Sequence, residues 1–336
     1  MIQTAFLGDV ILTMPLLTAL AQTHGPVDVV TTSQAAPLLE SHPAVATVVR
    51  YDKRGVNRGP VAWLALARLL RGRHYRRVYL PHRSWRSAAL VWAAGIPQRI
   101  GFGDSPARSS YTRRVSRDMA LHETRRLLAL AGETSAPVDF DFGLTDGEVD
   151  LAGEWLANHG ISQPFIAVAP GSVWGTKRWP SYADLAARLD HPVVVVGGPG
   201  EREAAAVIVA AAQGRAASAA GTMPLRLSAA VLSRARLLVT NDSAPLHLAG
   251  AVGTPVVAIF GPTVPAFGFG PLGPYDVIVE ELGGLACRPC SHHGPMTCPL
   301  GHHRCMLDIP VDTVEQAVRR VWRAVATGRD VQAETP

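Results

Sequence analysis

Short apolar runs alternate with amphipathic segments along most of the chain, a pattern typical of βαβ proteins with parallel sheets. In the first half, the pattern predicts strands over residues 2–6, 27–31, 46–50, 78–81 and 99–102. It predicts helices over 10–22, 60–71, 85–94 and 119–131. A second series predicts strands over 165–169, 193–196, 237–240 and 256–260, helices over 182–189, 201–212, 225–233 and 245–252, and a last helix over 311–327.

The polar stretch 134–150 lies between the two series, so we read it as the approach to a linker. We expect an N-terminal domain over residues 1–155, a second domain over 156–310 and a C-terminal helical segment over 311–328. A chain of 336 residues is long enough for two such domains. Both are expected to be Rossmann-like, with doubly wound parallel sheets facing across a cleft and ligands at the carboxyl ends of the strands.

Charge is distributed unevenly within a formal net charge of +5. Between Arg50 and Arg126 there are 18 Lys and Arg residues against four acids, whereas from Ile161 onward 14 basic residues face 13 acids. The excess favours an acidic partner for the first half: a phosphorylated lipid, an anionic membrane surface or a nucleic acid. A solvated arginine-rich surface is the alternative interpretation.

The apolar run over residues 11–21 resembles the core of a signal peptide, but Asp9 precedes it and no basic residue does. No apolar stretch reaches the length of a transmembrane helix. We therefore expect a cytoplasmic protein in which the four cysteines are thiols.

The first motif with chemical potential is F-L-G-D-V-I-L-T-M-P at residues 6–15. Gly8 supplies a turn after a strand, and Asp9 stands at the start of a helix, where a carboxylate can serve as a general base. A simple N-cap is the alternative for Asp9. A single glycine in this turn argues against a dinucleotide site.

A second motif, A-P-G-S-V-W-G-T-K-R-W-P at residues 169–180, follows a strand. Ser172 and Thr176 offer hydroxyl donors and Lys177 a point charge, so the loop can bind a phosphate. Its spacing is not that of a Walker A loop. An ordinary loop with a surface lysine is the alternative.

In a third motif, at residues 237–249, a buried strand runs into N-D-S-A-P-L-H. Pro245 falls in the first turn of the predicted helix, whose exposed N–H groups can bind phosphate. Asp242 would then orient the groups that bind the phosphate and would not contact the phosphate directly. His247 lies within reach of the same phosphate site. Helix capping is the alternative for Asp242 and Ser243.

Two further segments are weaker candidates. The G-G-P-G-E-R-E loop at residues 197–203 could let a ribose or an adenine approach the backbone, with Glu201 or Glu203 accepting hydroxyl hydrogen bonds. Four cysteines within nineteen residues, one pair at C-x-x-C spacing, could hold a structural zinc, although a cysteine-rich packed loop fits better than the irregular second spacing. These four are Cys287, Cys290, Cys298 and Cys305.

The chain resembles glycosyltransferase family 9, the ADP-heptose:lipopolysaccharide heptosyltransferases. The resemblance is carried, in order, by the motifs at residues 6–15, 171–180 and 241–263 and by the C-x-P-C…C-P…H-x-C-M tail. Within the family, the heptosyltransferase II group is the most similar. The resemblance spans essentially the whole chain. It implies a GT-B fold in which the C-terminal helix packs back toward the N-terminal domain. Members of the family usually have several more residues before the first strand, so we expect that this start is clipped.

The resemblance also implies site residues. Asp9 would be the general base, Ser172, Thr176 and Lys177 would bind the phosphates of the sugar donor, and Asp242, Ser243 and His247 would surround the diphosphate and the sugar. Glu201 and Met223 fit nucleoside contacts by spacing. The acceptor would lie against the N-terminal domain near Gly8, Thr13 and arginines between Arg50 and Arg126.

We therefore expect an inverting enzyme that transfers heptose from ADP-L-glycero-D-manno-heptose to a phosphorylated lipopolysaccharide-core acceptor. We expect no required cofactor and no nucleic-acid partner. The enzyme is expected to make peripheral contact with the anionic inner membrane. The alternatives are a GT-B transferase with another nucleotide sugar or acceptor, and a nucleotide-sugar-binding protein without turnover.

Overall fold

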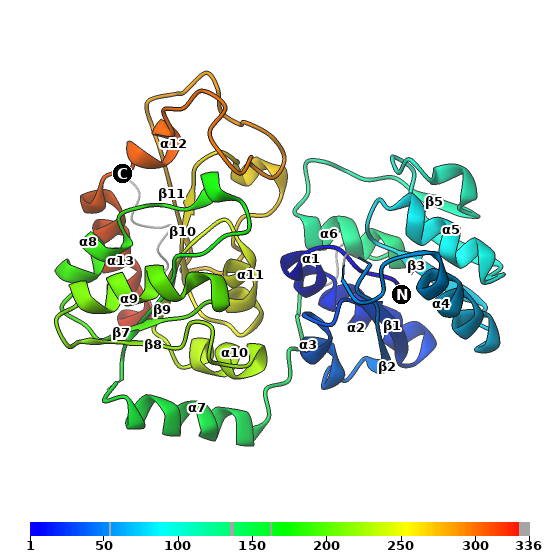
Figure 1. Ribbon diagram of the computed structural model, residues 1–336, viewed down its shortest axis with the longest axis horizontal. Helices are drawn as coiled ribbons and strands as arrows, with labels where there is room; N and C mark the ends of the chain where they lie inside the picture. The colour runs from blue at the N-terminus through cyan, green and yellow to red at the C-terminus, as the bar shows by residue number, and fades with distance from the viewer. Residues whose placement is uncertain (54, 135–137, 162, 329–336) are drawn as a thin grey trace. The chain divides into compact units, whose positions relative to one another are not determined.

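The computed structural model describes residues 1–53, 55–134, 138–161 and 163–328, and the chain divides into two compact units (Figure 1). Unit 1 is Met1–Gly143 and unit 2 is Leu144–Pro336. The elements of unit 1 are α1 Leu7–Leu12, α2 Met14–His24, β1 Val27–Thr31, α3 Ala36–Glu40, β2 Val45–Arg50, α4 Pro60–Gly72, β3 Arg77–Leu80, α5 Trp85–Ala93, β4 Gln98–Phe102, η1 Arg108–Ser110, β5 Arg113–Val115, α6 Glu123–Leu128 and η2 Ala129–Ala131.

The elements of unit 2 are α7 Asp146–Asn158, β6 Ile166–Ala169, η3 Gly175–Lys177, α8 Tyr182–Arg188, β7 Val193–Val195, η4 Pro199–Glu201, α9 Arg202–Ala211, β8 Ala216–Ser218, α10 Leu225–Ser233, β9 Leu237–Asn241, α11 Ala244–Ala251, β10 Val256–Phe260, η5 Pro265–Phe267, β11 Val277–Glu280, α12 Arg304–Leu307 and α13 Val311–Thr327. All the strand pairs of both units are parallel. The predicted fold class is thus confirmed.

In unit 1, the segment at the start of the chain connects a β1–β2 pair to a β3–β4–β5 sheet. Ile2 forms a parallel bridge with Val30, and its N–H donates to the Tyr79 carbonyl at 3.1 Å. The strand predicted over 2–6 is therefore wrong in extent. Its last residues serve the next helix instead, since the Phe6 N–H donates to the Asp9 carboxylate at the start of α1.

The helix predicted over 10–22 is also wrong in extent, because it divides into α1 and α2 at Thr13. Pro15 has no N–H and cannot continue the hydrogen bonds of α1. The Thr13 hydroxyl donates to the Val10 carbonyl at 2.6 Å and satisfies the end of α1. The two short helices pack with α6.

Unit 2 has a six-stranded sheet in the order β11-β10-β9-β6-β7-β8. The chain adds strands in one direction from β6 to β8, and then in the other direction from β9 to β11. Such a reversal leaves a crevice at the carboxyl ends of the two central strands, here β6 and β9. Helices α8, α9 and α13 cover one face of the sheet, and α10 and α11 the other.

Helix α7 was not predicted, although its N-terminus carries a clear signal. Thr145 and Glu148 form a capping box, with each side chain bonded to the other residue's backbone N–H. The helix packs on α10, so it belongs to unit 2. Part of the predicted linker approach, residues 135–137, lies outside the described residues. Helix α13 packs on α8 and on β9–β11 of its own unit.

Candidate functional site

Three polar side chains meet at the crevice of unit 2, each from the connection that follows a different strand. Lys177 follows β6, Asp242 follows β9, and Thr263 follows β10. The Lys177 Nζ lies 2.5 Å from Asp242 Oδ2, and the Thr263 hydroxyl donates to the same oxygen at 2.6 Å. The side chains of Lys177 and Asp242 are each about 10% exposed. The carboxylate therefore holds a largely buried ammonium group at the switch point of the sheet.

Capping does not account for Asp242 and Ser243. The N-cap residue of α11 is Ser243, and its side chain makes no capping hydrogen bond. The Asp242 carboxylate is directed to Lys177 and Thr263 instead. Because Asp242 lies next to this helix terminus, the Lys177 ammonium and the first N–H groups of α11 together form an environment suited to an anion.

The loop before Lys177 is fixed by side chains on both sides. The Asn241 amide accepts a hydrogen bond from the Trp179 N–H at 3.0 Å and donates to the Pro170 carbonyl at 2.9 Å. The Arg178 guanidinium donates twice to the Ser172 carbonyl, at 2.9 and 2.7 Å. The alternative of an ordinary loop with a surface lysine is wrong, because Lys177 is 8% exposed.

Thr176 ties this loop to a distant segment. Its hydroxyl donates to the Pro295 carbonyl at 2.6 Å, and its own carbonyl lies 2.8 Å from His303 Nε2. A Cβ on Gly294 would stand 3.1 Å from the Thr176 hydroxyl oxygen, and the φ of +75° there also favours glycine. The adjacent His293 has a lowered pKa, because of partial burial and the nearby Lys177 ammonium.

Sequence reasoning missed Arg178 and His293 as neighbours of this site. Arg178 could have been noticed from its position beside Lys177. Nothing in the sequence around His293 indicates that a segment more than a hundred residues away packs beside Lys177.

The remaining predicted residues of unit 2 follow β7, β8 and β9. His247 is buried in the first turns of α11, with its ring 6.4 Å from that of Phe269. On the other side, Glu201 lies so close to Gly171 that a Cβ there would stand 2.4 Å from its Cγ. Met223, half-buried, lies in the connection from β8 to α10.

The four cysteines are free thiols, and within the described ranges no group of three or more His, Cys, Asp or Glu residues could hold a metal ion. Cys287 Sγ stands 4.0 Å from His302 Nε2. Burial and the neighbouring thiols raise the pKa of Cys305 to about 11. Among the described residues, the zinc site considered above therefore has no supporting ligand group.

In unit 1, the predicted base lies at the carboxyl ends of the strands. Asp9 is half-buried in the first turn of α1, and its carboxylate accepts the Phe6 N–H at 3.0 Å. Gly8 and Thr13 are buried, and the Thr13 hydroxyl is bonded to Val10. Their proposed contacts with an acceptor stay predictions.

Lys53, the other lysine of the chain, lies near the start of the chain in unit 1. Its Nζ donates to the Thr4 hydroxyl at 3.2 Å. His82 follows β3, with its ring nitrogens 3.1 Å from the Ile2 carbonyl and 2.9 Å from the Ser87 hydroxyl. Burial, with a further contribution from Lys53, lowers the pKa of His82 to about 4. At neutral pH the imidazole is thus uncharged and Lys53 supplies the positive charge.

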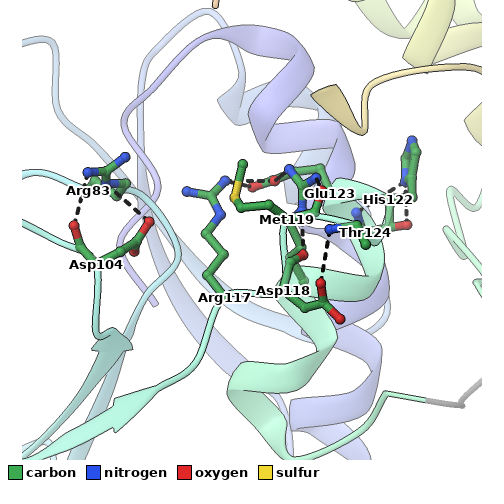
Figure 2. A network of polar contacts seen from close by, with 10 residues as sticks. Arg83, Asp104, Arg117, Asp118, Met119, His122, Glu123 and Thr124 are labelled. Atoms are coloured by element: carbon green, nitrogen blue, oxygen red, sulfur yellow. Dashed lines mark hydrogen bonds and ion pairs between the residues drawn. The ribbon is translucent and has the colours of Figure 1, made fainter. Parts of the chain in front are cut away.

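Some arginines between Arg50 and Arg126 are structural (Figure 2). Arg117 donates to both carboxylate oxygens of Glu123 at 2.7 Å, and Arg126 binds the same carboxylate at 3.2 Å. Arg126 is 1% exposed and also donates to the carbonyls of Asp118 and Met119. An acceptor cannot reach such a side chain, so it is not one of the contact residues.

Two units of parallel α/β structure, with polar side chains at the carboxyl ends of the strands, form the architecture of GT-B glycosyltransferases. A family model described as glycosyltransferase family 9 (heptosyltransferase) matches residues 63–300. The chain therefore belongs to this family and is a glycosyltransferase.

Relatives agree with this membership, and a solved structure has the same fold. Lipopolysaccharide heptosyltransferase 2 of Escherichia coli K12 is 29% identical over 224 residues, 60% of this chain and 64% of that protein, so the match spans less than two thirds of the relative. Lipopolysaccharide heptosyltransferase 1 of Pseudomonas aeruginosa is 29% identical over 315 residues, 86% of this chain and 85% of that one. The structure of E. coli ADP-heptose lipopolysaccharide heptosyltransferase II has a TM-score of 0.76 at 24% identity, covering 96% and 97% of the two chains.

No helix in the described part of the chain combines the length and the apolar composition needed to cross a membrane.

Proposed function

We propose that this protein transfers heptose from ADP-L-glycero-D-manno-heptose to a phosphorylated sugar of the lipopolysaccharide inner core, with inversion at the anomeric carbon. The observation that carries the proposal is the buried Lys177–Asp242 pair at the switch point of unit 2, in a chain of the heptosyltransferase family. The names of the relatives support the donor and the acceptor.

The sugar donor is assigned to unit 2. As the glycosidic bond breaks, the ADP leaving group takes the electron pair and gains negative charge at its terminal phosphate. Lys177 and the N–H groups at the start of α11 would stabilise that charge. Asp242 is a positioning residue that orients the ammonium. Ser172, Ser243 and His247 would contact the diphosphate or the sugar. Thr176 contributes by fixing the loop, since its hydroxyl is bonded to Pro295.

The nucleoside is assigned to the side of the crevice toward β7 and β8. Glu201 would accept hydrogen bonds from the ribose hydroxyls there, and Met223 would pack against the base. The close approach of Glu201 to Gly171 supports this position, because a larger residue at 171 would displace the carboxylate.

The acceptor is assigned to unit 1, with Asp9 as the general base. In an inverting transfer, the acceptor oxygen bonds to the anomeric carbon while the bond to the diphosphate breaks on the opposite face. The hydroxyl proton passes to the Asp9 carboxylate. Lys53, close to the same edge, supplies a positive charge for a phosphate of the acceptor. No step in this mechanism requires a metal ion.

Product analysis of the purified enzyme tests the proposal. We expect heptose transfer from ADP-heptose to a defined phosphorylated inner-core acceptor, with a product of inverted anomeric configuration by NMR. UDP- and GDP-sugars and acceptors without phosphate serve as comparisons. Turnover only with another sugar donor would indicate a different GT-B transferase, and tight ADP-heptose binding without any product would indicate a sugar-nucleotide sensor.

A further inference from the structure

Two neighbouring helices of unit 1 expose large apolar side chains on their outer faces. On α5, Trp85 and Trp92 are 67% and 68% exposed, and their spacing of seven residues puts both on one side of the helix. On α4, Val61 and Leu64 are 79% and 43% exposed. Two tryptophans this exposed are unusual for a surface that faces only water.

The two helices form one surface. They contact each other, and they lie side by side in Figure 1. Their inner faces enter the same core, through Leu66 and Leu70 of α4 and Leu90 and Val91 of α5. Their outer faces therefore point away from the sheet together. We call the outer residues Val61, Leu64, Arg68, Trp85, Arg86 and Trp92 the α4–α5 face.

The charge on this face has a single sign. From residue 53 to residue 103 the sequence has eleven Lys and Arg residues and no Asp or Glu. Arg68 falls within the exposed stripe of α4, and Arg86 lies beside Trp85 at the start of α5; both are exposed. Neither forms an ion pair with any residue in the described ranges.

We propose that the α4–α5 face docks unit 1 on an anionic phospholipid membrane, with Trp85 and Trp92 in the interfacial layer and Arg68 and Arg86 on lipid phosphates. Tryptophan favours the membrane interface, where its ring is apolar and its N–H remains hydrated. Arginine can extend its charged end to the headgroups while its stem covers apolar surface. The proposal rests on the proposed function in one respect, because a lipid-linked acceptor explains why the enzyme would need a membrane.

A second copy of the chain is a poorer occupant. In a two-fold symmetric contact the same patch meets itself, so the arginines of one face would oppose those of the other. An anionic bilayer complements both properties of the face at once, the apolar side chains and the uncompensated positive charge.

Vesicle cosedimentation of the full-length protein tests the proposal. We expect binding to phosphatidylethanolamine vesicles with roughly 30% phosphatidylglycerol and little binding to phosphatidylcholine. Trp85→Ser with Trp92→Ser should weaken binding at least about tenfold. Arg68→Gln with Arg86→Gln should weaken it about 30-fold, since each arginine near an anionic surface contributes a factor of roughly five.

Matched controls lie on unit 2. Leu282→Ser with Leu300→Ser removes two exposed apolar side chains, and Arg304→Gln with Arg323→Gln removes two exposed charges. Both control variants should bind vesicles as the wild type does. All variants should keep the thermal midpoint of the wild type. The tryptophan variant and both controls should also keep its turnover of a water-soluble acceptor.

The outcomes separate this inference from the proposed function. Vesicle binding by an enzyme that transfers no heptose would leave the docking face standing and remove the activity. Heptose transfer by a protein that ignores anionic vesicles would overturn the docking face alone. A tryptophan variant that changes the oligomeric state but not vesicle binding would overturn it too, and would identify the face as a contact between copies.

Discussion

Unit 1 and unit 2 share a parallel α/β plan but use charge differently. Unit 1 has 18 Lys and Arg residues against ten Asp and Glu, whereas unit 2 has 14 against 17. In unit 2 the buried cations Lys177 and Arg226 each face a carboxylate, on Asp242 and Glu148. In unit 1 two arginines share the single carboxylate of Glu123, and others remain at the surface.

This difference fits the two ligands that we propose. In unit 2, the ion pair with Asp242 holds the Lys177 ammonium in place and limits the electric field outside the protein. Such a paired charge suits a small molecule bound in a crevice. In unit 1 the excess of basic residues would favour large anionic partners. The net charge of +5 therefore averages two different designs.

The largest predicted effect concerns Asp9, an acid in the basic unit. Asp9→Asn keeps an oxygen that can accept the Phe6 N–H but removes the ability to take a proton. We expect kcat to fall by about 10²–10⁴-fold, the usual contribution of a general base, with the KM for ADP-heptose little changed. Steady-state kinetics and isothermal titration with ADP would measure both quantities. A kcat within a few fold of the wild type would exclude Asp9 as the base.

The next effect tests the pairing in unit 2. Lys177→Met leaves the Asp242 carboxylate buried without its cation, so we expect a loss of about 3–5 kcal/mol in unfolding free energy at neutral pH. Adding Asp242→Asn removes the unpaired charge and should restore part of that loss. Urea denaturation gives both values. If Lys177→Met alone proved neutral, the pair would contribute nothing to stability, and the contrast between the units would be weaker.

A second pair in unit 2 predicts a pH dependence. Hydrogen bonds from Arg226 are the main reason that the pKa of Glu148 falls to about 2, from 4.5. The resulting stability is complete above pH 4.5 and is lost as the pH falls toward 2. Glu148→Gln should therefore lower the unfolding free energy by about 2–3 kcal/mol at pH 7 and by little near pH 2.

The exposed Glu154 on the same helix is the control for this measurement. Glu154→Gln should change stability by no more than a few tenths of a kcal/mol at either pH. If the difference in unfolding free energy between Glu148→Gln and the wild type did not depend on pH, the Glu148 side chain would stabilise the protein by packing and not by its charge.

Local patterns were sufficient for the central part of the fold and for the core of unit 2. The buried strands before Lys177 and Asp242 are apolar runs followed by polar loops, and the parallel arrangement brings their carboxyl ends together. The missed strands β8 and β11 are short and lie at the edges of the sheet, so they depend on tertiary contacts. Helix α7 was missed although its capping box is a local signal, and it packs on α10.

The candidate site shows the same limit. The sequence predicted Lys177 and Asp242 but not that one carboxylate oxygen would hold both Lys177 and Thr263. It predicted arginine contacts in unit 1, yet Arg126 is consumed by internal hydrogen bonds. Burial of a charged side chain depends on its partners, and those partners are distant in sequence for Lys177.

The smallest predicted effect concerns Lys53, the lysine of unit 1. It is half-buried, and its Nζ donates to the Thr4 hydroxyl, whereas the ammonium of Lys177 is held by a carboxylate. Lys53→Gln should raise the KM for the phosphorylated acceptor about five- to tenfold, with kcat and the KM for ADP-heptose within about twofold. The effect should shrink at high salt, because partly exposed charges are screened. His82 gives a readout of the charge itself: its pKa of about 4 should rise in the variant, since Lys53 is one of the causes that lower it. An NMR titration that shows this rise without any change in acceptor KM would mean that Lys53 shapes the field at the edge of unit 1 but does not contact the acceptor.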